Sequence, residues 1–286
     1  MARFDEMHQA AIDWAADHLS SPLRSVEPLA GGMTSTMLAL TTLDGEEAVL
    51  RLITREPWRR HGADLARRER AAMVTLAAGP VPAPRSLALD ADGSTTGVSA
   101  HLMTRVPGRP TDEVDEGTVD QMAALLGTIH QHRPPEPFRP FQSWAWEAKW
   151  VVPPWTRHPQ AWRAAFSILA GPAPSFRPTF LHRDYGHRNL LWTGGLVTGV
   201  VDWVETSTGP VWLDAAHAAT NLVVGHDASW ARAFLTAYAA LTDEPLADYW
   251  LVMDAVGFLP PPGQEPMFAD PAALARLDDW VARIVG

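Results

Sequence analysis

The segment FLHRDYGHRNLLW, residues 180–192, decides which fold and which chemistry this chain can be assigned. It sets His182, Asp184 and Asn189 in the pattern H-x-D-x-x-x-x-N, with apolar residues on both sides. Farther along the chain, Asp202 ends a short apolar strand. One carboxylate of such a set can orient an attacking hydroxyl and accept its proton, while an amide and a second carboxylate can hold Mg²⁺ against ATP phosphates. The pattern therefore predicts a phosphoryl-transfer site.

Each residue of this pattern takes a role that suits its chemistry. We assign Asp184 as the catalytic base and group His182 and Arg183 with it, because they share the loop and His182 can support it by hydrogen bonds. Asn189 offers a neutral oxygen and Asp202 a charged one. Hard Mg²⁺ prefers such ligands, so these two residues are the candidate metal site.

A metal-dependent hydrolase is the alternative interpretation of the same acids and histidines. The side chains that could form its dinuclear site are His182, Asp184, His187, Asp202, His217 and His226. The chain lacks the H-E-x-x-H pattern and a second clustered His/Asp motif, and a hydrolase leaves its β-rich N-terminal part unexplained. We therefore prefer phosphoryl transfer, and interpret His217, beside Asp214 on one helix, as a structural histidine.

The composition describes a globular protein without disulfides. The chain has 286 residues, of which 47% are hydrophobic and 20% charged, enough for one large domain or two lobes. It contains no cysteine, and no apolar run reaches the ~18 residues of a membrane span. The net charge of −10 argues against nucleic-acid binding and favours a cationic or neutral partner. We therefore expect a cytoplasmic protein with no membrane or nucleic-acid partner, as a monomer or a homodimer.

The chain changes character near residue 105, where a β-rich part gives way to a helical one. The first part has predicted strands at 29–40 (with a turn inside), 48–53, 86–89 and 97–106, and a helix at 63–78. The second has predicted helices at 119–132, 160–169, 213–223, 228–241, 246–258 and 271–284, and short strands at 189–192 and 199–202. Because Pro-Gly-Arg-Pro breaks the pattern at 107–110, we predict a nucleotide-binding lobe, 1–105, and a catalytic and substrate-binding lobe, 106–286.

Two features of the first part suit the phosphates of a nucleotide. Arg51 lies alone in an apolar strand, and Glu69 follows on the next helix, so the two can form an ion pair that positions the α- and β-phosphates. The alternatives are that Arg51 faces solvent on an edge strand and that Glu69 is exposed. The turn with Gly31, Gly32, Thr34 and Ser35 can lay N–H groups and hydroxyls over phosphates, although a plain hairpin explains it nearly as well.

Several motifs follow one another in a defined order between residues ~20 and 225. They are Gly31-Gly32, Arg51, Glu69, HLMTRVPG at 101–108, the 182–189 array, Val201-Asp202-Trp203, and Gly209-Pro210 through Asp214. In this order and spacing the chain resembles the aminoglycoside phosphotransferase family, which is related to the protein kinases. The resemblance implies an α+β, two-lobed protein kinase-like fold, with a small antiparallel-sheet N-lobe and a larger, mainly helical C-lobe.

The resemblance also implies roles for individual residues. A hinge between the lobes would bind adenine through the backbone of Met103, Thr104, Arg105 and Val106. Asp184 would be the catalytic base, and Asn189 and Asp202 the Mg²⁺ ligands. Asp214 resembles the family's structural aspartate, which braces the catalytic loop.

Two positions depart from the usual pattern of the family. Arg183 stands where the family usually has glycine, and Arg51 stands where it often has lysine. Protein kinases carry arginine at the first position, so the catalytic assignment is unaffected. At position 51, arginine keeps the positive charge of lysine but carries it on a planar, forked guanidinium group instead of a compact ammonium group. This difference leaves the choice of ATP or GTP open.

The acceptor of the phosphate is suggested by acidic residues in the C-terminal part. An acidic pocket concentrates cationic ligands, and family members that phosphorylate polycationic antibiotics place acids around the acceptor. The candidate acceptor contacts are Asp227, Asp254, Glu265 and Asp270, with Trp203 and Trp230 as stacking surfaces. The alternative is that the acids lie on solvated helix faces and that the tryptophans belong to the core.

The sequence therefore predicts an enzyme that transfers the γ-phosphate of ATP or GTP, with Mg²⁺, to a hydroxyl of a small, cationic molecule. An aminoglycoside antibiotic is the leading acceptor, which suggests a role in antibiotic resistance. A macrolide, a basic peptide antibiotic, or a choline- or sugar-like metabolite comes next. A nucleotide-binding regulator without transfer activity is the alternative from another class. The intact set of Asp184, Asn189 and Asp202 argues against it.

Overall fold

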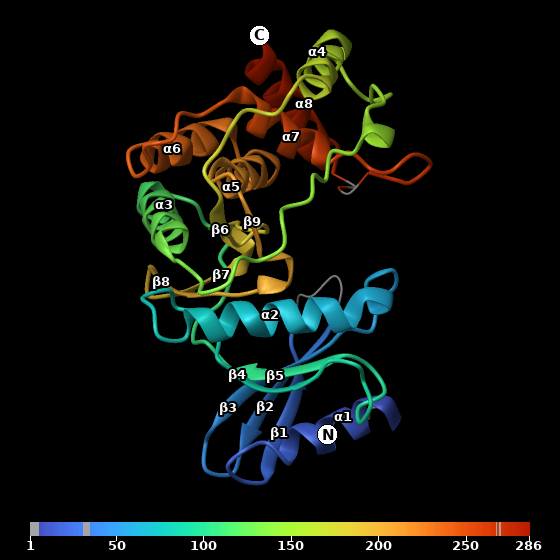
Figure 1. The fold of residues 1–286 in the computed structure, drawn as a ribbon, viewed down its shortest axis with the longest axis vertical. Helices are drawn as coiled ribbons and strands as arrows, with labels where there is room; N and C mark the ends of the chain where they lie inside the picture. Colours follow the sequence, from blue (N-terminus) through green and yellow to red (C-terminus); the bar gives the residue numbers. More distant parts are fainter. Residues whose placement is uncertain (1–5, 31–34, 267, 269) are drawn as a thin grey trace. The chain divides into compact units, whose positions relative to one another are not determined.

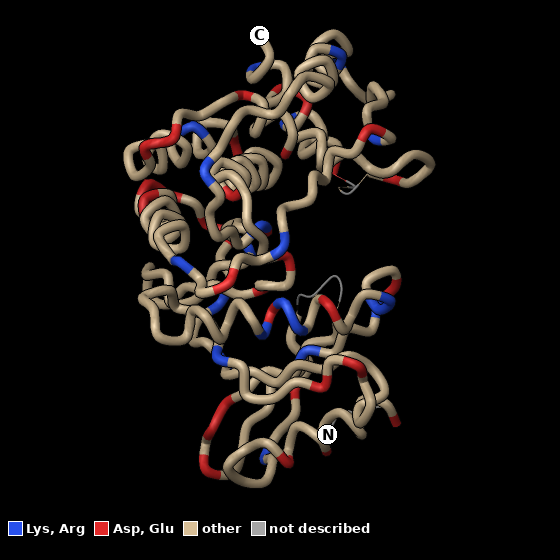
Figure 2. The backbone as a smooth tube through the Cα atoms, viewed as in Figure 1, with Lys and Arg blue, Asp and Glu red and all other residues tan. Residues whose placement is uncertain are grey.

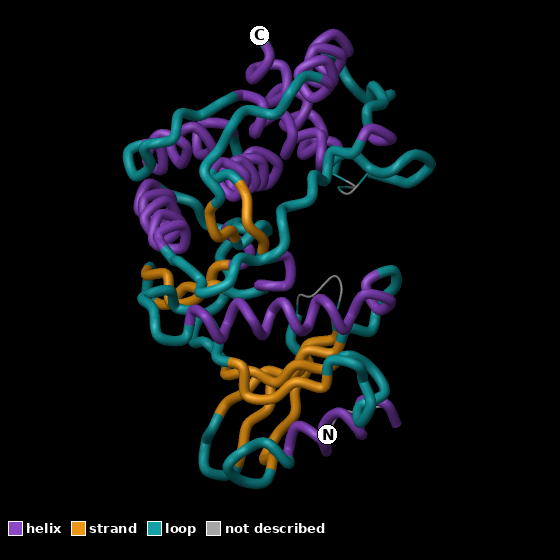
Figure 3. Tube along the Cα trace, in the orientation of Figure 1, coloured by secondary structure: helices purple, strands orange, loops and turns teal. Residues whose placement is uncertain are grey.

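The computed structural model describes residues 6–30, 35–266, 268 and 270–286. These residues divide into two compact units, one from Met1–Gly108 with Thr198–Glu205, the other from Arg109–Val197 with Thr206–Gly286. The first is built on a sheet and the second mainly on helices (Figure 1, Figure 3). The predicted α+β class, with a small antiparallel-sheet part and a larger helical part, is confirmed. The segment 198–205, which the predicted boundary at residue 105 assigns to the second lobe, belongs to the first unit.

The sheet of the first unit has five antiparallel strands in the order β1-β2-β3-β5-β4. The strands are β1 (Leu23–Pro28), β2 (Thr36–Thr42), β3 (Glu47–Leu52), β4 (Ser86–Asp90) and β5 (Ala100–Thr104). The first strand lies before the predicted one, because β1 is an edge strand whose charged residues hide it in the sequence pattern. β5 begins later than predicted, because Gly97, with φ +78°, turns the chain before it.

The two faces of this sheet are covered by different helices. Leu50 and Leu52 on β3 point to the face covered by α1 (Glu6–Ala16), where they join an apolar core. Arg51, between them, points to the opposite face, where α2 (Gly62–Leu76) lies. Figure 1 shows the two helices on opposite sides of the sheet. The alternation of a strand thus places one cation on the α2 face.

The second unit is built around one buried helix. α5 (Trp212–Gly225) packs against its neighbours α6, α7 and α8 and has buried residues on all its sides. A helix that is apolar all round belongs in a core. The other helices of the unit are α3 (Glu116–Gln131), α4 (Pro159–Ala170), α6 (Ala228–Ala239), α7 (Asp248–Gly257) and α8 (Pro271–Val285).

Short strands frame the loop that carries the H-x-D-x-x-x-x-N array. β6 (Thr179–Leu181) pairs antiparallel with β9 (Ser207–Gly209) immediately before the loop. β7 (Leu190–Thr193) and β8 (Leu196–Val200) form a two-stranded sheet immediately after it. In the part of the chain that the structure describes, no helix is long and apolar enough to cross a membrane.

Candidate active site

Asp214, near the start of α5, holds the beginning of the candidate catalytic loop. Its Oδ2 accepts a hydrogen bond from the backbone N–H of His182 (2.8 Å), and its Oδ1 accepts one from the backbone N–H of Arg183 (2.6 Å). His130 on α3 lies 3.1 Å from the same Oδ2 through Nε2. Burial raises the pKa of Asp214, but the hydrogen bond and charge of His130 outweigh it, so the pKa lies below its ordinary value. An ionised, buried carboxylate therefore fixes the loop.

Arg183 has a left-handed backbone, with φ +75°. This conformation is strained for residues with a Cβ and costs glycine almost nothing, which explains why glycine suits the position. The Arg183 side chain is nevertheless ordered: its guanidinium lies 3.9 Å from the ring centroid of Trp144, and Nη2 donates to the Gln142 carbonyl. These contacts, with the Asp214 bond to its N–H, stabilise the strained backbone.

The carboxylate of Asp184 is held from two sides. Its Oδ1 lies 2.9 Å from Nε2 of His217, and its Oδ2 accepts a hydrogen bond from the Asn189 amide (3.1 Å). The same amide nitrogen donates to the Asp184 carbonyl, and the Asp184 N–H donates to Nδ1 of His182. Burial raises the pKa of Asp184, but the hydrogen bond and the charge of His217 outweigh burial. The pKa of Asp184 therefore lies below its ordinary value, and the group is ionised. With 35% of its side chain exposed, this carboxylate can still receive a hydroxyl.

His217 is the functional neighbour that the sequence interpretation missed. The sequence predicts a structural histidine on the same helix as Asp214, whereas the ring contacts Asp184 and, through Nδ1, Oδ1 of Asp254 on α7 (3.0 Å). Asp214 is paired with His130 instead. A polar residue inside an otherwise apolar helix demands partners, and this is the signal that could have identified His217.

The first unit contains its own buried ion cluster. Arg51 Nη1 donates to Oδ1 of Asp202 at 2.8 Å, and Nη2 lies 3.5 Å from Oε1 of Glu69. His101, the cross-strand partner of Arg51, places Nδ1 2.8 Å from the other Glu69 oxygen. The Glu69 side chain is fully buried, and although burial raises its pKa, the Arg51 charge and the His101 hydrogen bond bring it below normal. Arg51 and Glu69 are therefore a buried pair, and neither faces solvent.

The two predicted metal ligands belong to different units, so their joint action stays a prediction. Asn189 lies in the second unit, and because its Nδ2 donates to Asp184, its amide oxygen is left for a cation. Asp202 lies in the first unit and uses Oδ1 for Arg51, which leaves Oδ2. These are hard oxygen donors, so the residues fit Mg²⁺. Among the described residues, no three His, Asp or Glu side chains are grouped to bind a metal, as the hydrolase alternative requires.

The predicted nucleotide contacts fall partly outside the described residues, which do not include Gly31, Gly32 and Thr34. Ser35 is buried immediately before β2. Met103 and Thr104 end β5, Arg105 pairs with Glu47 at 2.8 Å, and Val106 follows. The adenine-binding role of these residues stays a prediction.

The predicted acceptor contacts have varied surroundings. Asp227 and Asp270 cap α6 and α8, accepting hydrogen bonds from the backbone N–H of Ser229 (2.7 Å) and Ala272 (2.9 Å). Glu265 is exposed and Trp230 is half-buried on α6. Trp203 is fully buried in the first unit, where its Nε1 donates to the Val200 carbonyl. Asp and Glu residues are spread over both units (Figure 2). The role of these residues in acceptor binding stays a prediction.

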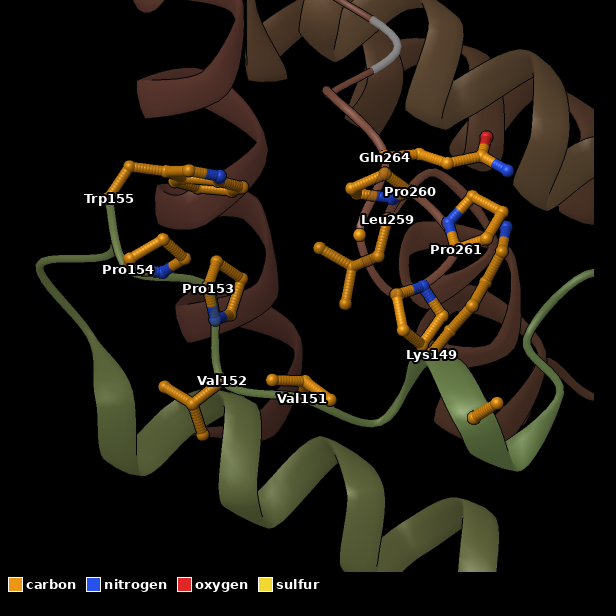
Figure 4. A pocket seen from close by; sticks show the side chains of 13 residues that line it. Lys149, Val151, Val152, Pro153, Pro154, Trp155, Leu259, Pro260, Pro261 and Gln264 are labelled. Atoms are coloured by element: carbon orange, nitrogen blue, oxygen red, sulfur yellow. The ribbon is translucent and has the colours of Figure 1, made fainter.

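An open cavity of about 260 Å³ lies in the helical unit between residues 148–155 and 259–264. Figure 4 shows its apolar lining, with Val152, Pro153 and Trp155 facing Leu259. The residue before Leu259 is Phe258, whose ring centroid is 5.5 Å from that of His217. The apolar lining of the cavity suits an apolar part of a ligand.

These features together define a class of protein. A sheet unit with a buried Arg–Glu pair and a helical unit with a braced Asp-Asn loop are the parts of a two-lobed, kinase-like phosphotransferase. The chain belongs to the phosphotransferase enzyme family (APH), whose model matches residues 25–250.

Solved structures with the same fold include several small-molecule kinases. A mutant of aminoglycoside phosphotransferase APH(4)-Ia, in complex with ADP and hygromycin B, is 18% identical, with 93% of this chain and 96% of that chain covered and a TM-score of 0.65. Amicoumacin kinase hAmiN, in complex with AMP-PNP, Ca²⁺ and Ami, is 17% identical (98% and 93% covered, TM-score 0.62). Aminoglycoside-3'-phosphotransferase of type VIII is also 17% identical (97% and 100% covered, TM-score 0.63). No curated protein sequence matches the chain.

Proposed function

We propose that this phosphotransferase uses ATP or GTP, with Mg²⁺, to phosphorylate a hydroxyl of a small molecule. The observation that carries the proposal is the Asp184 carboxylate, held by Asn189 and His217 on a loop that Asp214 braces. A carboxylate that is ionised, oriented and still partly exposed is what an acceptor hydroxyl requires. The relatives bound to ADP and AMP-PNP support the choice of nucleotide.

The chemistry of each residue in the proposed site suggests a separate role for it. Asp184 orients the acceptor hydroxyl and takes its proton late, as the hydroxyl oxygen bonds to the γ-phosphorus and the bond to the β,γ-bridging oxygen breaks, so that the nucleoside diphosphate leaves. Arg51, fixed by Glu69, neutralises the nucleotide phosphates. Asn189 and Asp202 would hold Mg²⁺, which supplies positive charge against the phosphate oxygens when bound.

The acceptor class that we propose first is a cationic antibiotic of the aminoglycoside type. The net charge of −10 and the relative bound to hygromycin B support it. The apolar cavity lined by Pro153, Trp155 and Leu259 favours a second candidate, an acceptor with an apolar part such as a macrolide. The relative bound to amicoumacin shows that the fold also serves acceptors outside the aminoglycosides. A basic peptide antibiotic and a choline- or sugar-like metabolite are the remaining candidate acceptors. We also propose that the protein is cytoplasmic and is a monomer or a homodimer.

A screen of ADP release tests this proposal. The protein is incubated with MgATP or MgGTP and, in turn, with aminoglycosides, macrolides, basic peptide antibiotics, amino alcohols and sugars, and products are identified by mass spectrometry. We expect one class to gain a phosphate, and Asp184→Asn to lower its rate by at least about 10²-fold. Asp243→Asn, which removes an exposed carboxylate paired with Arg177, is the matched control and should leave the rate unchanged. Nucleotide binding without transfer to any acceptor would favour the regulator instead.

A further inference from the structure

His217 stands between two carboxylates inside the helical unit. Its side chain is 7% exposed, with Nε2 2.9 Å from Oδ1 of Asp184 and Nδ1 3.0 Å from Oδ1 of Asp254. The three residues come from different elements: His217 from α5, Asp184 from the loop after β6, and Asp254 from α7. One imidazole ring therefore connects the candidate catalytic loop to two core helices.

The geometry favours a ring that carries two protons. Both nitrogens of the His217 ring face a carboxylate oxygen, and an imidazolium, whose two nitrogens are both donors, can donate a hydrogen bond to each. Burial lowers the pKa of His217, but the charges and hydrogen bonds of Asp254 and Asp184 outweigh it and raise the pKa to about 10. At neutral pH the ring keeps both protons.

Aromatic side chains enclose the ring. The indole of Trp144 meets it edge to face, with ring centroids 5.2 Å apart and planes at 76°, and the Phe258 ring lies 5.5 Å away at 33°. These apolar contacts shield the His217 ring from water, while the Asp184 carboxylate stays partly exposed. They also fix the plane of the His217 ring, and with it the direction of both N–H bonds.

We propose that His217 is the positioning residue of Asp184, and that Asp254 anchors His217 in turn. The inference rests on the proposed function, because it takes Asp184 to be the group that meets the acceptor hydroxyl. His217 on Oδ1 and Asn189 on Oδ2 together fix the plane of the Asp184 carboxylate. Its remaining lone pairs then point in set directions toward the exposed side.

Asp254 is placed for this anchoring role. It is 2% exposed, and its second oxygen, Oδ2, is buried without a hydrogen bond in the described structure. Its charge therefore acts on the ring of His217. A ring held in this way keeps its Nε2 on Oδ1 of Asp184, which suits a carboxylate that must be oriented toward a hydroxyl.

Three variants separate positioning from mere packing. His217→Phe keeps a ring of similar size and removes both donors, while His217→Gln keeps an amide donor without the charge. Because His217→Phe leaves Asp254 buried without a partner, the double variant His217→Phe/Asp254→Leu provides a folded comparison if the single variant unfolds. The matched control is His158→Gln, in a partly exposed pair with Asp279 (2.9 Å).

The first readout is steady-state transfer from MgATP to the acceptor found by the screen. We expect kcat to fall about 10- to 100-fold in His217→Phe and in the double variant, with KM for ATP within about twofold of wild type. His217→Gln should recover part of the loss, and His158→Gln should match wild type. An unchanged kcat in folded His217→Phe, or in the double variant, overturns the positioning role. A wild-type protein that phosphorylates no acceptor overturns the proposed function, and this inference with it.

The second readout needs no acceptor. The ¹⁵N-edited proton NMR spectrum of the wild-type protein at pH 8 should contain two protected ring N–H signals that vanish in His217→Gln. Asp254→Asn should move one of them strongly and Asp184→Asn the other. A His217 ring with a single N–H at this pH overturns the proposal, whatever the kinetics show.

Discussion

The two units each contain one buried cation between two carboxylates, and the two clusters differ in the cation. In the sheet unit Arg51 lies between Glu69 and Asp202, and in the helical unit His217 lies between Asp184 and Asp254. One carboxylate of each set is a predicted functional group, Asp202 in the first and Asp184 in the second. The other carboxylate of each set is buried and holds the cation in place.

The difference lies in what the cations can do. Arginine keeps its proton at every accessible pH, so the Arg51 cation has one charge state. Histidine can lose a proton, so the His217 cation has two charge states, and its pKa is raised. The sheet unit therefore holds a permanent charge at the predicted phosphate contact, whereas the helical unit holds an adjustable charge beside the candidate base.

Breaking the Arg51 cluster should have the largest effect on stability. Glu69→Leu leaves the Arg51 guanidinium buried without its inner partner, and removal of one member of a buried pair costs about 3–5 kcal/mol. Urea unfolding followed by circular dichroism measures the loss. Glu47→Leu, which removes an exposed partner of Arg105, is the control and should cost less than about 1 kcal/mol. Equal losses of unfolding free energy in the two variants would show that the buried pair stabilises the fold no more than the exposed pair does.

The Arg51 cluster could be predicted from the sequence more fully than the His217 cluster, for a physical reason. Arg51 is one charge in an apolar strand, and the alternation of a strand places it on the face of α2, so its need for Glu69 could be inferred locally. The spacing of Asp184 and Asn189 is also local, within one loop.

The His217 cluster could not be found in this way. Its partners lie on a separate loop and a separate helix, and only the packing of α5 against α7 brings Asp254 to the ring. Sequence periodicity reports which face of a helix is buried, and α5 is buried on all sides. The sequence therefore indicated that His217 needs partners without indicating which ones.

The adjustable charge of His217 should appear as a pH-dependent stability. The folded ring has a pKa of about 10 and the unfolded one about 6.5. Between these values the folded state holds a proton that the unfolded state has lost, so stability falls as pH rises, by at most about 1.4 kcal/mol per pH unit. The difference in unfolding free energy between wild type and His217→Gln should be constant below pH ~6.5 and shrink toward pH ~10. A difference that does not change with pH contradicts the raised pKa.

Lys149, a further titratable side chain buried in the helical unit, should show the opposite sign. Its Nζ donates to the Gly257 carbonyl, and burial lowers its pKa from 10.5 to about 8. Between these values the unfolded state holds a proton that the folded state has lost, so the contribution of Lys149 to stability rises with pH. The unfolding free energy of wild type relative to Lys149→Met should increase from pH ~8 to ~10.5, over a narrower span than for His217. A decrease over this range would contradict the lowered pKa.

The smallest expected effect concerns backbone strain in the two regions. Among the described residues, Arg183 and Asp202 are the non-glycine residues with positive φ, at +75° and +68°, and each lies at or beside a predicted functional group. At Asp202 the carboxylate is the predicted metal ligand, and aspartate tolerates this conformation better than most residues. At Arg183 the backbone N–H is what Asp214 holds, while the side chain contributes its contacts with the Trp144 ring and the Gln142 carbonyl. Arg183→Ala loses these contacts and keeps the strain, whereas Arg183→Gly loses the contacts and relieves the strain. We expect the glycine variant to be the more stable of the two by about 1 kcal/mol in urea unfolding, because relief of a left-handed Cβ outweighs the added freedom of the unfolded chain.

The control is the same comparison at an exposed helical residue, Arg163→Gly against Arg163→Ala on α4, where alanine should be the more stable by about 1 kcal/mol. If alanine were the more stable residue at both positions, Arg183 would be unstrained.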